Sequence, residues 1–443
     1  MLSSLNASAH KTIIHNISKK VFFIFWAFIV FRIGSYIPIP FVDSDALSLF
    51  MKQNANGLLG VLNTFAGGSV SRMSLFALSI MPYITASIII QLLTVVHKPL
   101  GELRKEGEQG RQKIQNYTRF LAIFLCIFQS YGVSAGLENL RIGDMNVVIM
   151  PGLVFRLCAV VTLTGGTVFL IWLGDRITSK GIGNGISLII FAGIVAEFPK
   201  FSGRLLDMAS SGAISGWFIA IFFAALLGLV FFVTFMEKAY RKIPIHYAKR
   251  AAGPQSSQNT SYIPLKINTA GVIPPIFASS FLLFPATISG FLGSDKETAS
   301  SSLLHAIVRY LSHGQPLYII FYASIIVFFS YFYTSIIFNS QETAENLRKN
   351  SGYVTGFRPG KSTAEYFDYV LTRMTTIGAF YLCAICLLPE ILTTRNSIPF
   401  YLGGTSILII VNVTIDTLSQ INMQFYSYKY KSILRKAEKR KKR

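Results

Sequence analysis

The sequence predicts an all-α membrane protein with ten transmembrane helices. Ten long apolar stretches run through the 443 residues, and most come close to the ~20 residues that cross a ~30 Å hydrocarbon core. Hydrophobic residues make up 52% of the chain and charged residues only 14%, which is unlike a soluble protein of this length. The stretches cover residues 21–37, 73–96, 117–136, 153–173, 183–196, 214–236, 269–290, 316–338, 372–388 and 401–424.

Basic residues fall on alternate sides of these stretches. Of the eleven polar segments, the odd-numbered ones hold 31 of the 41 Lys and Arg residues, and the even-numbered ones hold 8. Short basic loops stay in the cytoplasm, so this asymmetry predicts an even number of spans with both chain ends inside. The net charge of +21 therefore collects beside the membrane, where orientation and anionic headgroups explain most of it without nucleic acid.

The elements follow in order along the chain. Residues 1–20 are polar and basic, and the next apolar run is too long for a cleavable signal, so it should remain as the first span. The ten stretches divide into an N-terminal half at 21–200 and a C-terminal half at 201–424, followed by a basic cytoplasmic tail at 425–443. Because five spans is an odd number, the halves should cross the membrane in opposite senses, as inverted repeats do.

A weak internal sequence repeat supports the division into two halves. SIMPYITAS at 79–87 resembles GVIPPIFASS at 271–280, and each lies in the second span of its half. Proline within a membrane helix removes backbone hydrogen bonds, so we expect both segments to line an interior, with a simple kink as the alternative.

Long polar segments at 97–119, 237–268 and 339–373 should be functional cytoplasmic loops. The third contains GFRPG at 356–360, whose glycines and proline predict that Arg358 lies at a turn. A solvated loop arginine is the alternative interpretation.

The sequence shows no catalytic constellation, so neither an enzyme nor a cofactor or metal site is expected. The six His residues are scattered, and GIGNG at 181–185 lacks the Lys-Ser/Thr of a phosphate loop, which favours a turn that opens the fifth span. The Cys383-Ala-Ile-Cys386 spacing is typical of ordinary helix packing when no further ligand is nearby. Arg32 and Asp416 are the deep charges, and they leave an ion-coupled secondary transporter open as an alternative. A lipid-modifying enzyme is a weaker one.

Several ordered motifs carry a family resemblance. NTFAGGSVSRMSLFALSIMPYITASIIIQLL at 63–93 resembles the plug and second span of the SecY family, the channel subunits of the bacterial protein translocase. Segments similar to other parts of that family follow in the same order: KEGEQGR at 105–111, GIGNGIS at 181–187, AGVIP at 270–274, GFRPG at 356–360 and PFYLGGTS at 399–406.

The resemblance implies an hourglass channel of two pseudo-symmetric inverted halves of five helices. Such a channel conducts unfolded polypeptides across the bacterial inner membrane and releases membrane segments sideways into lipid. A ring of apolar side chains is implied to close it, because an apolar constriction dewets and blocks ions without binding a passing chain. The implied ring residues are Ile80, Ile84, Ile186, Ile190, Ile276 and Ile409.

A short re-entrant plug helix is implied at about 63–72, where a plain periplasmic loop is the alternative. Its AGGS core is too small and flexible for a stable lipid-facing helix, which suits an element that must move. The implied plug residues are Asn63, Phe65, Gly67, Gly68, Ser69 and Arg72. Thr85 and Asn268 would be polar residues of the lateral gate, between the second and third spans and the seventh and eighth.

The resemblance also implies partners. Arg241, Lys242 and Arg358 match basic positions that meet the ribosome or the SecA motor, whose ATP hydrolysis would supply energy beside the membrane potential and ribosomal synthesis. The loop tip GPQSS at 253–257 lacks the arginines of some relatives, and the tail KRKKR at 439–443 would face ribosome or lipid. Further implied partners are the SecE and SecG subunits, signal peptides and nascent chains, anionic lipids, SecDF and YidC.

Overall fold

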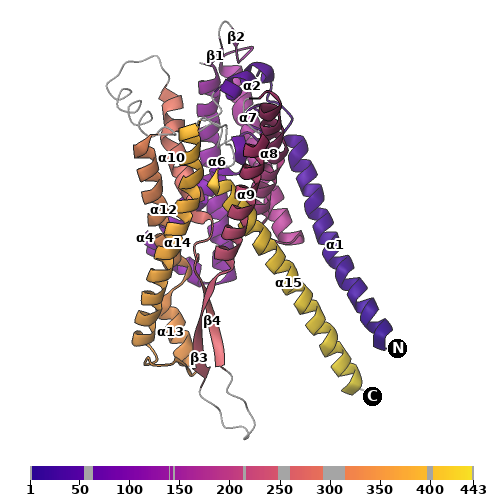
Figure 1. The fold of residues 1–443 in the computed structure, drawn as a ribbon, viewed down its shortest axis with the longest axis vertical. Helices are drawn as coiled ribbons and strands as arrows, with labels where there is room; N and C mark the ends of the chain where they lie inside the picture. The colour runs from indigo at the N-terminus through magenta and orange to yellow at the C-terminus, as the bar shows by residue number, and fades with distance from the viewer. Residues whose placement is uncertain are drawn as a thin grey trace. The chain divides into compact units, whose positions relative to one another are not determined.

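The computed structural model describes residues 2–53, 63–138, 140–142, 145–212, 216–247, 260–292, 315–396 and 403–441 (Figure 1). The described chain is mainly helical, which confirms the predicted all-α class, with two small sheets in the loops. The helices are α1 (Leu2–Gly34), α2 (Ser44–Gln53), α4 (Met81–Val96), α5 (Lys98–Lys105), α6 (Glu108–Glu138), α7 (Leu153–Lys180), α8 (Gly185–Ser210), α9 (Gly216–Lys238), α10 (Ile273–Leu292), α12 (Pro316–Ile337), α13 (Ser340–Lys349), α14 (Lys361–Asn396) and α15 (Gly404–Lys441). The strands are β1 (Arg141–Ile142), β2 (Met145–Asn146), β3 (Tyr240–Tyr247), β4 (Thr260–Lys266) and β5 (Gly352–Val354).

Each predicted apolar stretch overlaps a described helix. Seven of these helices are long and apolar enough to cross a membrane, and an eighth span results if α4 and α5, which meet at a 100° bend, are counted as one. α10 contributes a shorter apolar helix at Ile273–Leu282 within the described residues. The chain is thus a multi-pass membrane protein, while the total of ten spans stays a prediction.

The prolines of the repeated motif lie at helix starts, so the premise that they remove backbone hydrogen bonds was wrong, and the alternative of a kink does not apply to them. That both segments line an interior stays a prediction. Pro82 lies at the first positions of α4, and Pro274 and Pro275 lie in the first turn of α10. No intrahelical hydrogen bond is lost there, because the first four N–H groups of a helix have no partner in any case. The apolar stretch that begins at residue 73 runs as turns until Ile80, so α4 starts later than expected.

The chain divides into two compact units. The first comprises Met1–Ser215, Phe284–Arg309 and Ile409–Arg443, and the second comprises Gly216–Leu283 and Tyr310–Leu408. In the first unit α4 packs on α6, α6 on α7, and α7 on α8. A cluster that includes Ile39, Leu47, Met73, Leu137 and Phe155 joins α2 and the 73–80 turns to the ends of α6 and α7.

The second unit has a three-stranded sheet on a helical base. β3 pairs antiparallel with both β4 and β5 in the order β4-β3-β5, and α14 packs on α12 and α13 (Figure 1). Ile243 and Ile245 of β3 are buried on one face with Val354 of β5 and Phe367 of α14. Lys242 and Pro244, which alternate with them, are exposed, and so is Arg241 near the start of the strand, so this sheet presents basic side chains from a fixed base.

Candidate functional site: a clasped plug segment

The predicted plug, residues 63–72, folds as one short helical turn that ends at two glycines. Residues 63–65 are helical, and Gly67 and Gly68 have φ angles of 63° and 80°. The Gly68 N–H donates to the Asn63 carbonyl at 2.8 Å and the Gly67 N–H to the Thr64 carbonyl at 3.2 Å. These are the two hydrogen bonds of a Schellman motif, in which glycine takes the left-handed position after a helix. The AGGS core therefore stops the helix, in line with its composition.

The segment closes on itself after this turn. The Asn63 side-chain Oδ1 accepts a hydrogen bond from the Ser71 N–H at 2.8 Å, and the Ser71 Oγ donates to the Gly68 carbonyl at 2.8 Å. Both ends of the segment are thus tied to each other by local bonds.

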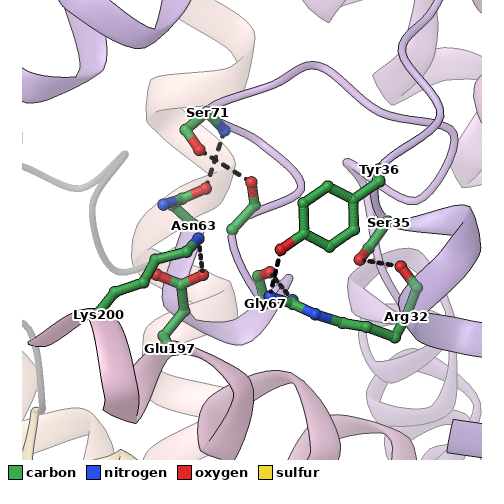
Figure 2. A network of polar contacts seen from close by, with 9 residues as sticks. Arg32, Ser35, Tyr36, Asn63, Gly67, Ser71, Glu197 and Lys200 are labelled. Atoms are coloured by element: carbon green, nitrogen blue, oxygen red, sulfur yellow. Dashed lines mark hydrogen bonds and ion pairs between the residues drawn. The ribbon is translucent and has the colours of Figure 1, made fainter. Parts of the chain in front are cut away.

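Arg32 holds this piece from α1. Its Nη1 donates to the Gly67 carbonyl at 2.9 Å and its Nη2 to the Tyr36 Oη at 2.9 Å (Figure 2). A carbonyl that accepts from a guanidinium is bound by a charge-assisted bond, which is stronger than a neutral one. The contact joins residues 35 positions apart and satisfies a cation that an apolar helix could not carry alone.

Tyr36 lies against a second cation. The Arg32 Cζ lies 4.8 Å from the centre of the Tyr36 ring, and the Arg72 Cζ lies 4.1 Å from it. The Nε and Nη2 of Arg72 are buried and have no described hydrogen-bond acceptor. Arg72 at the end of the plug is therefore held by cation–π attraction to the same ring, and its Nε and Nη2 have no described acceptor to donate to.

On its other side the segment rests on α8. A Cβ added to Gly193 of α8 would lie 2.7 Å from the Phe65 carbonyl oxygen, and one added to Gly67 would lie 3.1 Å from the Gly193 Cα. The two backbones approach so closely that only glycine fits at Gly193 without a shift. One turn further along α8, Glu197 pairs with Lys200 at 2.7 Å beside Gly68 (Figure 2).

The chain leaving the plug is fastened as well. The Ile39 N–H donates to the Met73 carbonyl and the Leu75 N–H to the Ile37 carbonyl, both at 2.9 Å, so residues 37–39 and 73–75 pair as short extended segments. Phe76 then stacks between Phe31 of α1 and Phe169 of α7, with 6.0 Å between ring centres on each side. The C-terminal end of the plug is thus fixed to α1 and α7.

The predicted ring residues lie on helix faces and are largely buried. Ile80 and Ile84 are one turn apart at the start of α4, and Ile186 and Ile190 are one turn apart on α8. Ile80, Ile84, Ile190 and Ile409 of α15 are buried, and Ile186 is half-buried. Ile276 on α10 is half-buried and belongs to the second unit, so the six-residue ring as a set stays a prediction.

The two predicted gate residues make local hydrogen bonds. The Thr85 Oγ1 donates to the Met81 carbonyl within α4 at 3.1 Å. Asn268 is 5% exposed, and its Nδ2 donates to the Glu237 Oε1 at 2.7 Å and to the Gly271 carbonyl at 3.1 Å. Asn268 therefore ties the end of α9 to the approach of α10, a contact that the sequence did not predict.

The predicted docking residues are exposed around the sheet of the second unit. Arg241 and Lys242 lie on β3, opposite Leu265 and Pro264 of β4. Arg358 lies in the turn between β5 and α14, where its carbonyl accepts a hydrogen bond from the Thr363 Oγ1 at 2.8 Å. The predicted turn position of Arg358 is confirmed, with Gly356 and Gly360 at φ angles of 88° and 111°.

A second turn prediction is confirmed at 181–185. α8 begins at Gly185, and the Asn184 side chain caps it by accepting from the Ile186 N–H at 3.1 Å. Sequence reasoning flagged Arg32 as a deep charge but missed that its acceptor is a plug carbonyl. It also missed Gly193, for which a small residue in an apolar helix was the available signal.

The sequence matches one family across most of its length. The SecY family model matches residues 74–418. The protein translocase subunit SecY of Rickettsia bellii is 47% identical over 435 residues, which cover 98% of this chain and 99% of that protein. The protein translocase subunit SecY of Escherichia coli (strain K12) is 48% identical over 423 residues, which cover 95% of this chain and 94% of that protein.

Solved structures share the fold. "The structure of a protein conducting channel" aligns with a TM-score of 0.62 at 17% identity, covering 92% of both chains. "Sec61 in the Canine ribosome-channel complex from the endoplasmic reticulum" aligns with a TM-score of 0.60 at 18% identity, again covering 92% of both chains.

Removing the guanidinium of Arg32 should loosen the plug. Arg32→Met deletes a charge-assisted hydrogen bond, worth about 1.5–3 kcal/mol, together with a cation–π contact. We expect the resting ion conductance of the purified chain in planar bilayers to rise by roughly tenfold or more. Arg176→Met is the control, because Arg176 also lies over an aromatic ring, that of Trp172, at 5.4 Å. Equal resting currents in wild type and Arg32→Met would contradict the clasp.

A methyl group at Gly193 should displace the plug without changing any charge. Gly193→Ala places a Cβ against the Phe65 carbonyl, so we expect a raised resting current as well. Gly203→Ala is the matched control in α8, since its Cβ would meet nothing within 4 Å and alanine favours helices by roughly 1 kcal/mol over glycine. A folded Gly193→Ala protein that conducts no more than Gly203→Ala would show that this contact does not seat the plug.

Proposed function

This chain belongs to the SecY family, and we propose that it forms the polypeptide-conducting pore of a protein translocase in a bacterial inner membrane. It is a translocation channel subunit and not an enzyme, as the names of its relatives at 45–48% identity state. The alternative of an ion-coupled secondary transporter is wrong, because these relatives are translocase subunits. Its two candidate charges fit this outcome: Arg32 binds a backbone carbonyl, and Asp416 is exposed on α15.

The clasped segment at 63–75 carries the proposal for the mechanism. A short turn that is fixed at its C-terminal end and held by a few separable polar contacts suits a plug that closes the resting channel and moves aside for a translocating chain. The contacts are strong enough to favour one position and weak enough to break, since each is worth on the order of 1–3 kcal/mol.

The six isoleucines would form the constriction next to this plug. Ile80 directly follows the plug-bearing turns and caps α4, so the plug and this part of the ring share one stretch of chain. A constriction of isoleucine side chains would exclude ions by dewetting, and it would make no sequence-specific contact with a passing polypeptide. The lateral exit would open between α4 and α6 on one side and α10 and α12 on the other, near Thr85 and Asn268.

Docking would use the exposed basic side chains of the second unit. Arg241 and Lys242 lie on β3 of a sheet with its own hydrophobic core, and Arg358 lies in the turn that follows β5, so this base would hold all three in place against a partner. Related structures include ribosome-bound channels, and we propose that this chain likewise meets the ribosome. SecA, SecE, SecG, SecDF and YidC are further proposed partners, with both chain ends in the cytoplasm.

Polar groups in the ring should open a path for ions. Ile84→Asn/Ile190→Asn adds two amides to buried positions, lowers the cost of wetting the constriction and should raise the resting current. Ile88→Asn is the control, because Ile88 is buried one turn further along α4 but lies outside the predicted ring. Unchanged planar-bilayer conductance in a folded double variant would leave these residues as helix packing.

Reversing the charge of Arg358 should weaken the export that SecA drives. Arg358→Glu leaves the hydrophobic core of the sheet intact, so the channel should remain abundant while SecA-driven export into membrane vesicles falls by roughly tenfold, the effect of about 1.4 kcal/mol in binding. Lys349→Glu, an equally exposed basic residue at the end of α13, serves as the control. If Arg358→Glu exports as well as Lys349→Glu, then Arg358 is only a solvated loop residue.

A further inference from the structure

The second unit contains a polar cavity where two of its spans end. The cavity measures about 320 Å³ and lies among the last turns of α12, the start of α13 and the third turn of α14. It is lined by Tyr331, Thr334, Ser335, Phe338, Asn339, Ser340, Gln341, Asp368, Leu371, Thr372 and Thr375. This volume falls within the range of small-molecule sites, about 300–1,000 Å³, and far exceeds the ~30 Å³ of one water.

One wall of this cavity is rich in hydrogen-bond acceptors. Asp368 is the charged residue of the lining, and no ion pair is described for it. The hydroxyl groups of Thr334, Ser335 and Thr372 donate to carbonyls of their own helices, so their oxygens remain as acceptors. A ligand group that meets this wall should be a cation with several N–H donors.

The other wall is rich in donors. α13 starts at Ser340, and its Asn339 cap accepts from the Glu342 N–H, which leaves the N–H groups of Ser340 and Gln341 at a helix N-terminus. Ser340 is only 5% exposed, and its Oγ is buried without a described partner although it lines the cavity. A helix N-terminus with a free hydroxyl favours an anion such as a phosphate.

The surroundings indicate a lipid as the source of this ligand. The cavity lies at the end of α12, a span by length and composition, and exposed apolar side chains flank it along that helix, Phe328 at 60% and Ile337 at 47%. In the proposed channel the segment 339–373 is cytoplasmic, so the cavity would lie at the level of the inner headgroups. Acyl chains could then run along the outside of α12.

We propose that this cavity binds the headgroup of an aminophospholipid, a phosphoethanolamine, with its ammonium on Asp368 and its phosphate at the start of α13. This site rests on the proposed channel function, which supplies its depth in the membrane. A choline headgroup has no N–H donors for the acceptor wall, and a glycerol headgroup has no cation for Asp368. The site should therefore prefer phosphatidylethanolamine to phosphatidylcholine and to phosphatidylglycerol.

Lipid retention by the purified full chain tests this site. The chain is reconstituted in nanodiscs with equal parts of the three lipids, and the lipids that stay bound after transfer to detergent are counted by native mass spectrometry. Wild type should retain phosphatidylethanolamine roughly tenfold above phosphatidylcholine, the range expected for one charge-assisted contact. Phosphatidylglycerol also binds the basic loops, so its retention should be the same in wild type and Asp368→Asn. Soluble phosphoethanolamine at equal concentration should not displace it, because the acyl chains add burial.

Two variants and a control make the result specific. Asp368→Asn should abolish the preference, and Ser340→Ala should lower retention of phosphatidylethanolamine, while Glu365→Gln, an exposed carboxylate of α14 outside the lining, should behave as wild type. Wild type without a preference, or Asp368→Asn with an unchanged one, overturns the proposal. The measurement uses an idle channel, so a negative result would not bear on export or resting conductance. Failure of the proposed channel function would instead appear in those two assays.

Discussion

A cation inside an apolar helix bundle must find an acceptor, and this requirement organises the first unit. Arg32 meets it with the Gly67 carbonyl and the Tyr36 hydroxyl, at 2.9 Å each. The same bond satisfies the carbonyl oxygen of a buried residue, which would cost free energy if it were left unpaired. One contact thus pairs two polar groups, and it adds to the packing that holds the plug between α1 and α8.

The remaining contacts of the plug determine the geometry of this interaction. Gly193 lets two backbones approach, and the Schellman turn at Gly67 directs the carbonyl toward α1. None of these contacts is covalent, and Arg72 keeps two N–H groups without described acceptors. The arrangement suits a closure that is specific in position but reversible. In the second unit, by contrast, Asn268 and the core beneath β3 build a base that does not depend on such a bond.

Local signals in the sequence predicted local structure well. The apolar runs predicted the helices, GIGNG predicted the start of α8, and the glycines of GFRPG predicted the turn at Arg358. The premise that the prolines remove hydrogen bonds failed because hydropathy does not show where a helix begins, and Pro82 lies in the first turn of α4. The acceptor of Arg32 could not be predicted from the sequence, because every residue offers a carbonyl and only tertiary packing selects that of Gly67. The ring depends on both units, and residue type alone does not assemble it.

The central claim is that residues 63–72 form a folded plug that is locked at rest and released by a passing chain. Hydrogen exchange at the backbone amides of this segment tests it most directly, in the idle channel and with a polypeptide arrested in transit. The amides of Gly68, Ser71 and Leu75 are hydrogen-bonded in the closed arrangement and should exchange slowly at rest. With a chain in transit the plug would leave Arg32 and α8, and a single helical turn without tertiary support opens readily. The amides of Gly68 and Ser71 should then lose protection, while that of Leu75, beyond the plug, keeps it. Fast exchange of all three at rest, or protection that a transiting chain leaves unchanged, would contradict the account.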